Sequence, residues 1–90
     1  MSDRLDKIRR ALVELQEELR NLESIDEPTR EALADAAADI ADTLRQGKRS
    51  ARTGIAESSL RDGLAGFEAS HPQLAGILTR LLDGLAQLGI

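Results

Sequence analysis

The chain contains no cysteine, tryptophan or tyrosine, and only one phenylalanine and one histidine in 90 residues. Without cysteine it can form no disulfide, no thiolate metal site and no thiol nucleophile. With one aromatic residue, the core must be built from aliphatic side chains, which are plentiful at 41% hydrophobic residues. Domains of this size are only marginally stable alone. We therefore expect packed helices whose core is completed by a second copy of the chain.

Long apolar runs are also missing. No stretch approaches the ~20 apolar residues that span a bilayer. The first ten residues, MSDRLDKIRR, are charged from the third position and lack the apolar region of a secretory signal peptide. The expectation is a cytoplasmic protein without a membrane segment.

The strongest pattern present is a heptad-like seam in the first quarter of the chain. Its apolar positions are Leu5, Ile8, Leu12, Leu15, Leu19 and Leu22. Steps of three and four residues place all of them on one face of a helix, predicted over 3–23. Basic residues crowd the early half of this segment and acidic residues the late half, which favours antiparallel pairing with a second copy or with the next helix.

Three further helices are predicted, over about 27–46, 55–69 and 71–88. Asp26 is the expected N-cap of the second helix, with Pro28 in its first turn. Ser70 is the expected N-cap of the last, with Gln73 completing a capping box. The fold class is all-α: antiparallel helical hairpins forming a small bundle of about four helices, one domain over 1–90.

Residues 47–54 show no apolar period and form the expected flexible linker. Around it, the stretch 44–53 contains four bases and no acid, whereas the rest of the chain is strongly acidic. The four bases are Arg45, Lys48, Arg49 and Arg52. They are candidate phosphate contacts, although an acidic body repels nucleic acid over most of its surface. Nucleic acid is therefore an unfavoured partner, and we expect a solvated loop.

Glu68 and His71 form an E-x-x-H pair, which in di-iron bundles ligates metal when both side chains share a helix face. Ser70 and Pro72 argue for a helix break between them. We therefore expect His71 to face solvent and Glu68 to cap or pair locally, with no metal and no cofactor. No nucleophile elbow or phosphate-binding glycine motif is present, so no enzymatic activity is expected.

The segment FEASHPQL, followed by a leucine-rich helix ending LAQLGI and preceded by a D-E-x-T-R helix restart, resembles a family of short bacterial proteins. That family is known only as a domain of unknown function. The resemblance covers most of the chain and is firmest over 12–33 and 67–90. It implies a bacterial source and an all-helical fold, and it assigns no activity, substrate or site.

These observations favour an interaction protein, a small scaffold or regulatory adaptor that self-associates as a homodimer, with an unidentified protein as a further candidate partner. The predicted interface residues are Leu5, Ile8, Leu12, Leu15, Leu19, Leu22, Leu78, Leu81, Leu82 and Leu85. If the first seam lies between two chains, Leu15→Glu should abolish dimerisation. The alternative is a nucleic-acid-associated regulator that uses the Arg45–Arg52 patch.

Overall fold

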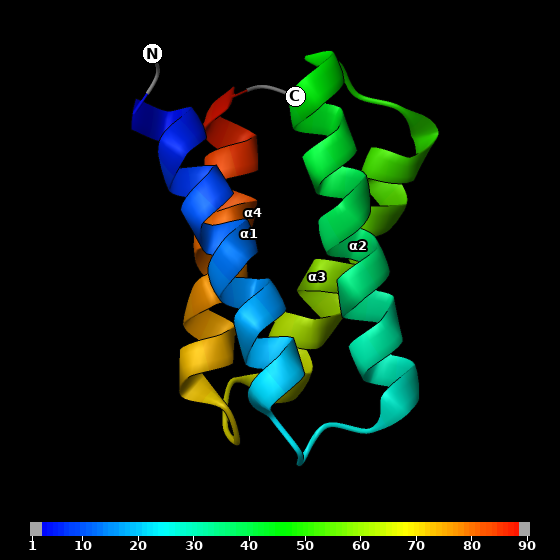
Figure 1. Cartoon of the computed structure of the whole chain (residues 1–90), viewed down its shortest axis with the longest axis vertical. Helices are drawn as coiled ribbons and strands as arrows, with labels where there is room; N and C mark the ends of the chain where they lie inside the picture. The colour runs from blue at the N-terminus through cyan, green and yellow to red at the C-terminus, as the bar shows by residue number, and fades with distance from the viewer. Residues whose placement is uncertain (1–2, 89–90) are drawn as a thin grey trace.

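The computed structural model describes residues 3–88, and this part of the chain contains four helices and no strand. The helices are α1 (Asp3–Asn21), α2 (Glu27–Gln46), α3 (Ala51–Phe67) and α4 (Pro72–Leu88). Figure 1 shows them running alternately down and up an elongated bundle of 35 × 25 × 20 Å. The predicted all-α class is confirmed.

The connections are short, at 22–26, 47–50 and 68–71. Short loops force successive helices to be antiparallel neighbours. The first and last helices also meet, since α1 packs most extensively on α4 and α2 most extensively on α3 (Figure 1). Each helix therefore has two neighbours, and each presents its remaining face to solvent.

The apolar stripes meet in a single core inside one chain. Most of the α1 seam is buried, with Leu15 fully inaccessible, and the faces that cover it belong to α4 and α2. The buried members of the predicted interface set are Ile8, Leu12, Leu15, Leu19, Leu78, Leu81 and Leu85. These seven side chains are already packed inside the monomer, so two folded chains cannot meet through them. Only Leu5, Leu22 and Leu82 of that set are half-buried.

Helix α3 begins at Ala51, about a turn before the predicted start near Ile55. The predicted linker 47–54 is therefore reduced to a loop of residues 47–50. The buried stripe of α3 begins with Thr53 and Ala56, and Ile55 points outward with 66% of its surface exposed. The sequence pattern missed this first turn because threonine and alanine are weak markers of an apolar face.

Helix α4 begins at Pro72, so its N-cap position is His71 and not Ser70. The His71 carbonyl accepts the Ala75 N–H at 3.0 Å, which is the first helical bond. The His71 N–H donates to the Phe67 carbonyl at 2.8 Å and closes the corner. The predicted capping box is not formed, because Gln73 reaches instead toward Glu18 of α1.

Candidate interaction surfaces

The basic residues predicted to contact phosphate all lie at one end of the bundle, around the α2–α3 loop. Arg45 lies in the last turn of α2, Lys48 and Arg49 lie in the loop, and Arg52 follows in the first turn of α3. Arg45 is ion-paired with Asp42, and Arg49 is ion-paired with Glu57. Two of the four charges are therefore partly compensated within the chain.

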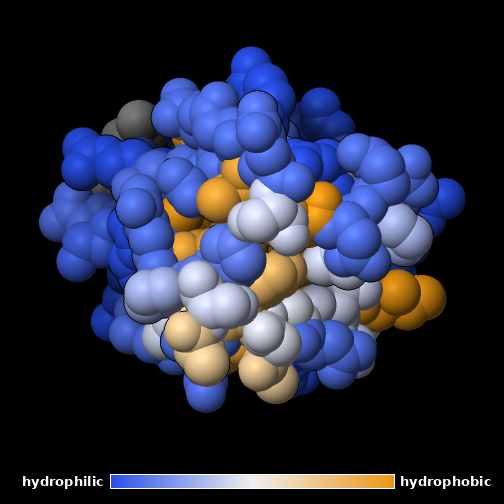
Figure 2. All heavy atoms as spheres, turned by 90° about the horizontal axis from the view of Figure 1, so that it is seen from below, coloured by the Kyte–Doolittle hydropathy of each residue, from blue (hydrophilic) through white to orange (hydrophobic). Residues whose placement is uncertain are grey.

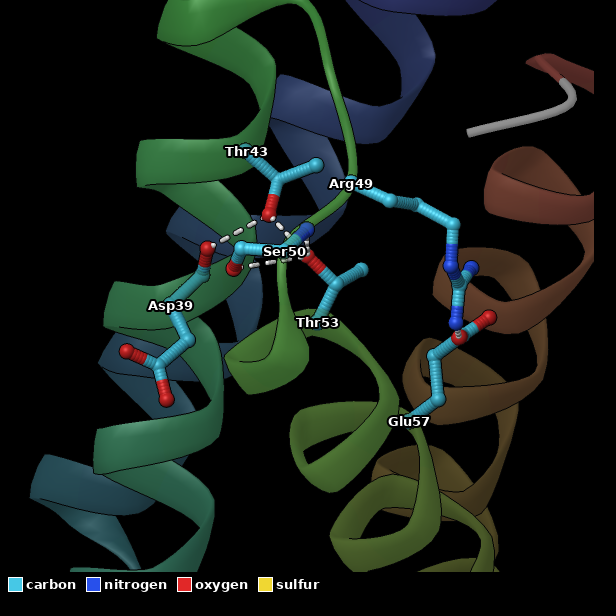
Figure 3. A network of polar contacts seen from close by, with 6 residues as sticks. All are labelled: Asp39, Thr43, Arg49, Ser50, Thr53 and Glu57. Atoms are coloured by element: carbon cyan, nitrogen blue, oxygen red, sulfur yellow. Dashed lines mark hydrogen bonds and ion pairs between the residues drawn. The ribbon is translucent and has the colours of Figure 1, made fainter.

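A buried chain of hydroxyl groups fastens this loop (Figure 3). Thr43 Oγ1 donates to the Asp39 carbonyl at 3.0 Å, so its single hydrogen is used. Thr53 must therefore donate across the 2.7 Å contact to Thr43 Oγ1. Thr53 Oγ1 in turn accepts the Ser50 N–H at 3.0 Å. The expected flexible linker is thus a short loop bonded to the helices on both sides.

The early half of α1 brings further bases to the same end of the bundle (Figure 1). We call this the basic end; its bases are Arg4, Lys7, Arg9, Arg10, Arg45, Lys48, Arg49 and Arg52. A groove of about 430 Å³ between α1 and α4 is lined by Arg4, Lys7, Arg10 and Arg80, and also by one acid, Asp83. The place of Arg80 in this surface was not predicted, because only the packing of α4 on α1 brings it there.

The opposite end is acidic. The acidic end carries Glu17, Glu18, Glu23, Asp26, Glu27, Glu31 and Glu68, from the end of α1, the start of α2 and the α3–α4 corner. Arg20 and Arg30 are the bases among them, and Arg30 is ion-paired with Glu27. The antiparallel topology therefore gathers most of the bases at one end, where Asp3, Asp6, Asp42 and Glu57 lie among them, and leaves the opposite end predominantly acidic.

At the acidic end, His71 is half-buried, and the expectation that it faces solvent is corrected. Its ring packs edge-on against Phe67, with centroids 5.2 Å apart and planes at 87°. Nε2 lies 2.8 Å from Ser24 Oγ in the α1–α2 loop, and Nδ1 lies 3.0 Å from Ser70 Oγ. His71 and Phe67 therefore pack together at the α3–α4 corner, and His71 links this corner to the α1–α2 loop.

Glu68 follows the last residue of α3 and is exposed, whereas His71 precedes α4, so the pair does not share a helix face. Within residues 3–88, no group of three or more His, Asp or Glu side chains is arranged to hold a metal ion.

A shallow groove between α2 and α3 opens beside this corner, with a volume of about 500 Å³. Pro28, Leu33 and Phe67 line it, and Gly63 and Gly66 leave its floor without side chains. Figure 2 views this end of the molecule and shows apolar residues in a central hollow bordered by hydrophilic ones.

Over the described range 3–88, none of the four helices has the length and apolar character needed to cross a membrane.

The family model that matches the chain is the domain of unknown function DUF4404, over residues 8–90. The chain belongs to this family. The match covers nearly the whole bundle, from the second residue of the α1 seam onward, and confirms the resemblance found in the sequence. Gly89 and Ile90, which close the family-like LGI ending, lie outside the described residues. No curated protein and no solved structure matches this DUF4404 chain.

Proposed function

We propose that this DUF4404 protein is a non-enzymatic helical interaction protein, a scaffold or regulatory adaptor of the cytoplasm that forms a homodimer. The observation that carries the proposal is the unequal distribution of charge, with eight bases at the basic end and seven acids at the acidic end. Surfaces of opposite charge on one molecule attract each other across two copies and steer their association. The leucine seam is mostly buried in the core of the chain itself, so we assign the dimer contact to the outer surface.

Light scattering over a concentration series tests this proposal. The mass should rise from 9.8 kDa toward twice that value as concentration increases. Raising the salt concentration from about 0.05 to 1 M should favour the monomer, because the screening length falls to about 3 Å. A mass that stays at 9.8 kDa at every concentration in low salt would reject self-association.

The alternative proposal, a nucleic-acid-associated regulator, draws support from the basic end being larger than the Arg45–Arg52 patch alone. Arg9 of α1 and Arg45 of α2 line one groove, so the two clusters are continuous. The ion pairs of Arg45 and Arg49 and the acidic remainder of the molecule weigh against it. Electrophoretic mobility shifts at low and moderate salt test it, and no shift at low salt would end this alternative.

A further inference from the structure

We infer that two copies associate through the outer faces of their α1 helices, antiparallel and around a two-fold axis at Val13. This inference rests on the proposed self-association and assigns its surface and its geometry. Val13 is 54% exposed and lies near the middle of α1. Ile8, Ala11, Leu15 and Leu19 are buried on the side of the helix opposite to it, so Val13 points away from the core.

The charges around Val13 are self-complementary. On a helix that turns about 100° per residue, the side chains within about 60° of Val13's direction belong to the following positions. They are Asp6, Arg9, Arg10, Gln16, Glu17 and Arg20. A two-fold axis at Val13 makes the two helices antiparallel. It places each residue level with the residue of the second copy that lies equally far from Val13 in the opposite direction along the helix. Arg9 then meets Glu17 of the second copy, and Asp6 meets its Arg20.

The same pattern disfavours a parallel arrangement. A parallel two-fold pair would place each residue beside its own counterpart, Arg9 against Arg9 and Glu17 against Glu17, and such like-charge contacts are unfavourable. Among residues 3–88, neither Arg9, Glu17 nor Arg20 is engaged in an ion pair. Glu14, by contrast, is held by Arg80 at 2.7 Å within the chain.

The surroundings of α1 leave room for a second helix. An open groove of about 520 Å³ on the α4 side is lined by Val13, Arg10 and Arg80. A second groove of about 420 Å³ on the α2 side is lined by Gln16, Ala38 and Ala41. α1 is 19 residues long, and we expect a contact confined to this helix to bury less than the roughly 1,200 Å² of standard interfaces. The dimer is therefore weak and reversible.

Charge exchange between positions 9 and 17 tests the geometry. Arg9→Glu places a second carboxylate opposite Glu17, and Glu17→Arg places a second guanidinium opposite Arg9. Each single variant should therefore dimerise about tenfold more weakly or worse. An equimolar mixture of the two variants should form a heterodimer. In this heterodimer the two carboxylates of one chain face the two guanidinium groups of the other, so both contacts join opposite charges. The double variant Arg9→Glu/Glu17→Arg should recover wild-type association.

The matched control for these charge changes is Arg61→Glu on α3. This helix does not contact α1, and Arg61 is exposed. The control carries the same change in net charge as Arg9→Glu, and it should leave the mass of the wild-type dimer unchanged.

The absence of cysteine allows an independent test at the axis. Val13→Cys should cross-link to itself under mild oxidation, because a two-fold axis brings the two copies of position 13 together. Ile55→Cys, on the exposed face of α3, should cross-link at least tenfold more slowly.

The outcomes separate the two proposals. The α1 geometry would be overturned, with self-association left intact, by a dimer that survives both single charge reversals or is not restored by the double variant. Equally fast cross-linking of the Val13→Cys and Ile55→Cys variants would overturn it as well. A wild-type monomer at all concentrations would overturn both proposals.

Discussion

At the scale of single residues, Gly84 shows how closely α1 and α4 approach each other. A Cβ atom built on Gly84 would lie 2.5 Å from Ile8 Cγ1 and 3.0 Å from Ile8 Cδ1. Ile8 is 1% exposed, and its branched side chain has few alternative rotamers. The glycine is therefore required by packing between these two helices and not by its backbone conformation.

Gly84→Ala should lower the free energy of unfolding by about 1–3 kcal/mol, because the overpacking cost exceeds the gain in helix propensity. Gly76→Ala, in the same helix, is the matched control. Nothing lies within 4 Å of its added Cβ, and it should raise stability by about 0.4–1 kcal/mol. Urea denaturation of both variants measures the difference, and equal shifts would contradict the close approach.

At the scale of elements, the start of α3 depends on a hydrogen bond from another helix. Thr53 is fully buried, so water cannot replace a partner that it loses. Its hydroxyl accepts from Ser50 and contacts Thr43 near the end of α2. The helix thus begins where the polar groups of the α2–α3 loop find hydrogen-bond partners, a turn before the first large apolar residue of α3.

Thr53→Val keeps the side-chain shape and removes the hydroxyl, and it should lower the free energy of unfolding by about 1–3 kcal/mol. Thr53→Ser retains the hydroxyl and should be less destabilising. Hydrogen exchange at the Ser50 amide should become faster in the valine variant alone. Unchanged exchange at Ser50 would mean that the hydroxyl chain does not hold the loop.

At the scale of the whole molecule, one chain closes its own core, and the described part leaves no buried side-chain polar atom without a hydrogen-bond partner. The expectation that a second copy must fill the leucine seam is therefore replaced by a core to which all four described helices contribute. Any self-association adds to a monomer that is already folded. A substitution in the seam is therefore expected to affect folding before it affects association.

Leu15→Glu should unfold the protein and not merely separate a dimer. Leu15 is inaccessible, and an unpaired buried carboxylate costs a large part of the roughly 5–15 kcal/mol that stabilises a small domain. Circular dichroism should show loss of helix and of cooperative melting. Ala65→Glu, an exposed site on α3, should remain folded. A Leu15→Glu protein that is helical and monomeric would instead support the prediction that the seam lies between two chains.

The amino-acid sequence alone determined the helical class, the number of helices and most of their buried faces. These features follow from short-range periodicity, caps and loop lengths, and every residue needed to recognise them lies within a few turns.

The tertiary structure alone decided what covers each face. Ser24 and His71 are 47 positions apart, and the α1 seam is closed by α4 from the other end of the chain. The first turn of α3 depends on Thr43 across a loop. An apolar stripe indicates only that it must be buried, and a hydroxyl only that it needs a partner. Because dispersion and hydrophobic burial are non-directional, the partner of each face is decided only when all four helices pack together.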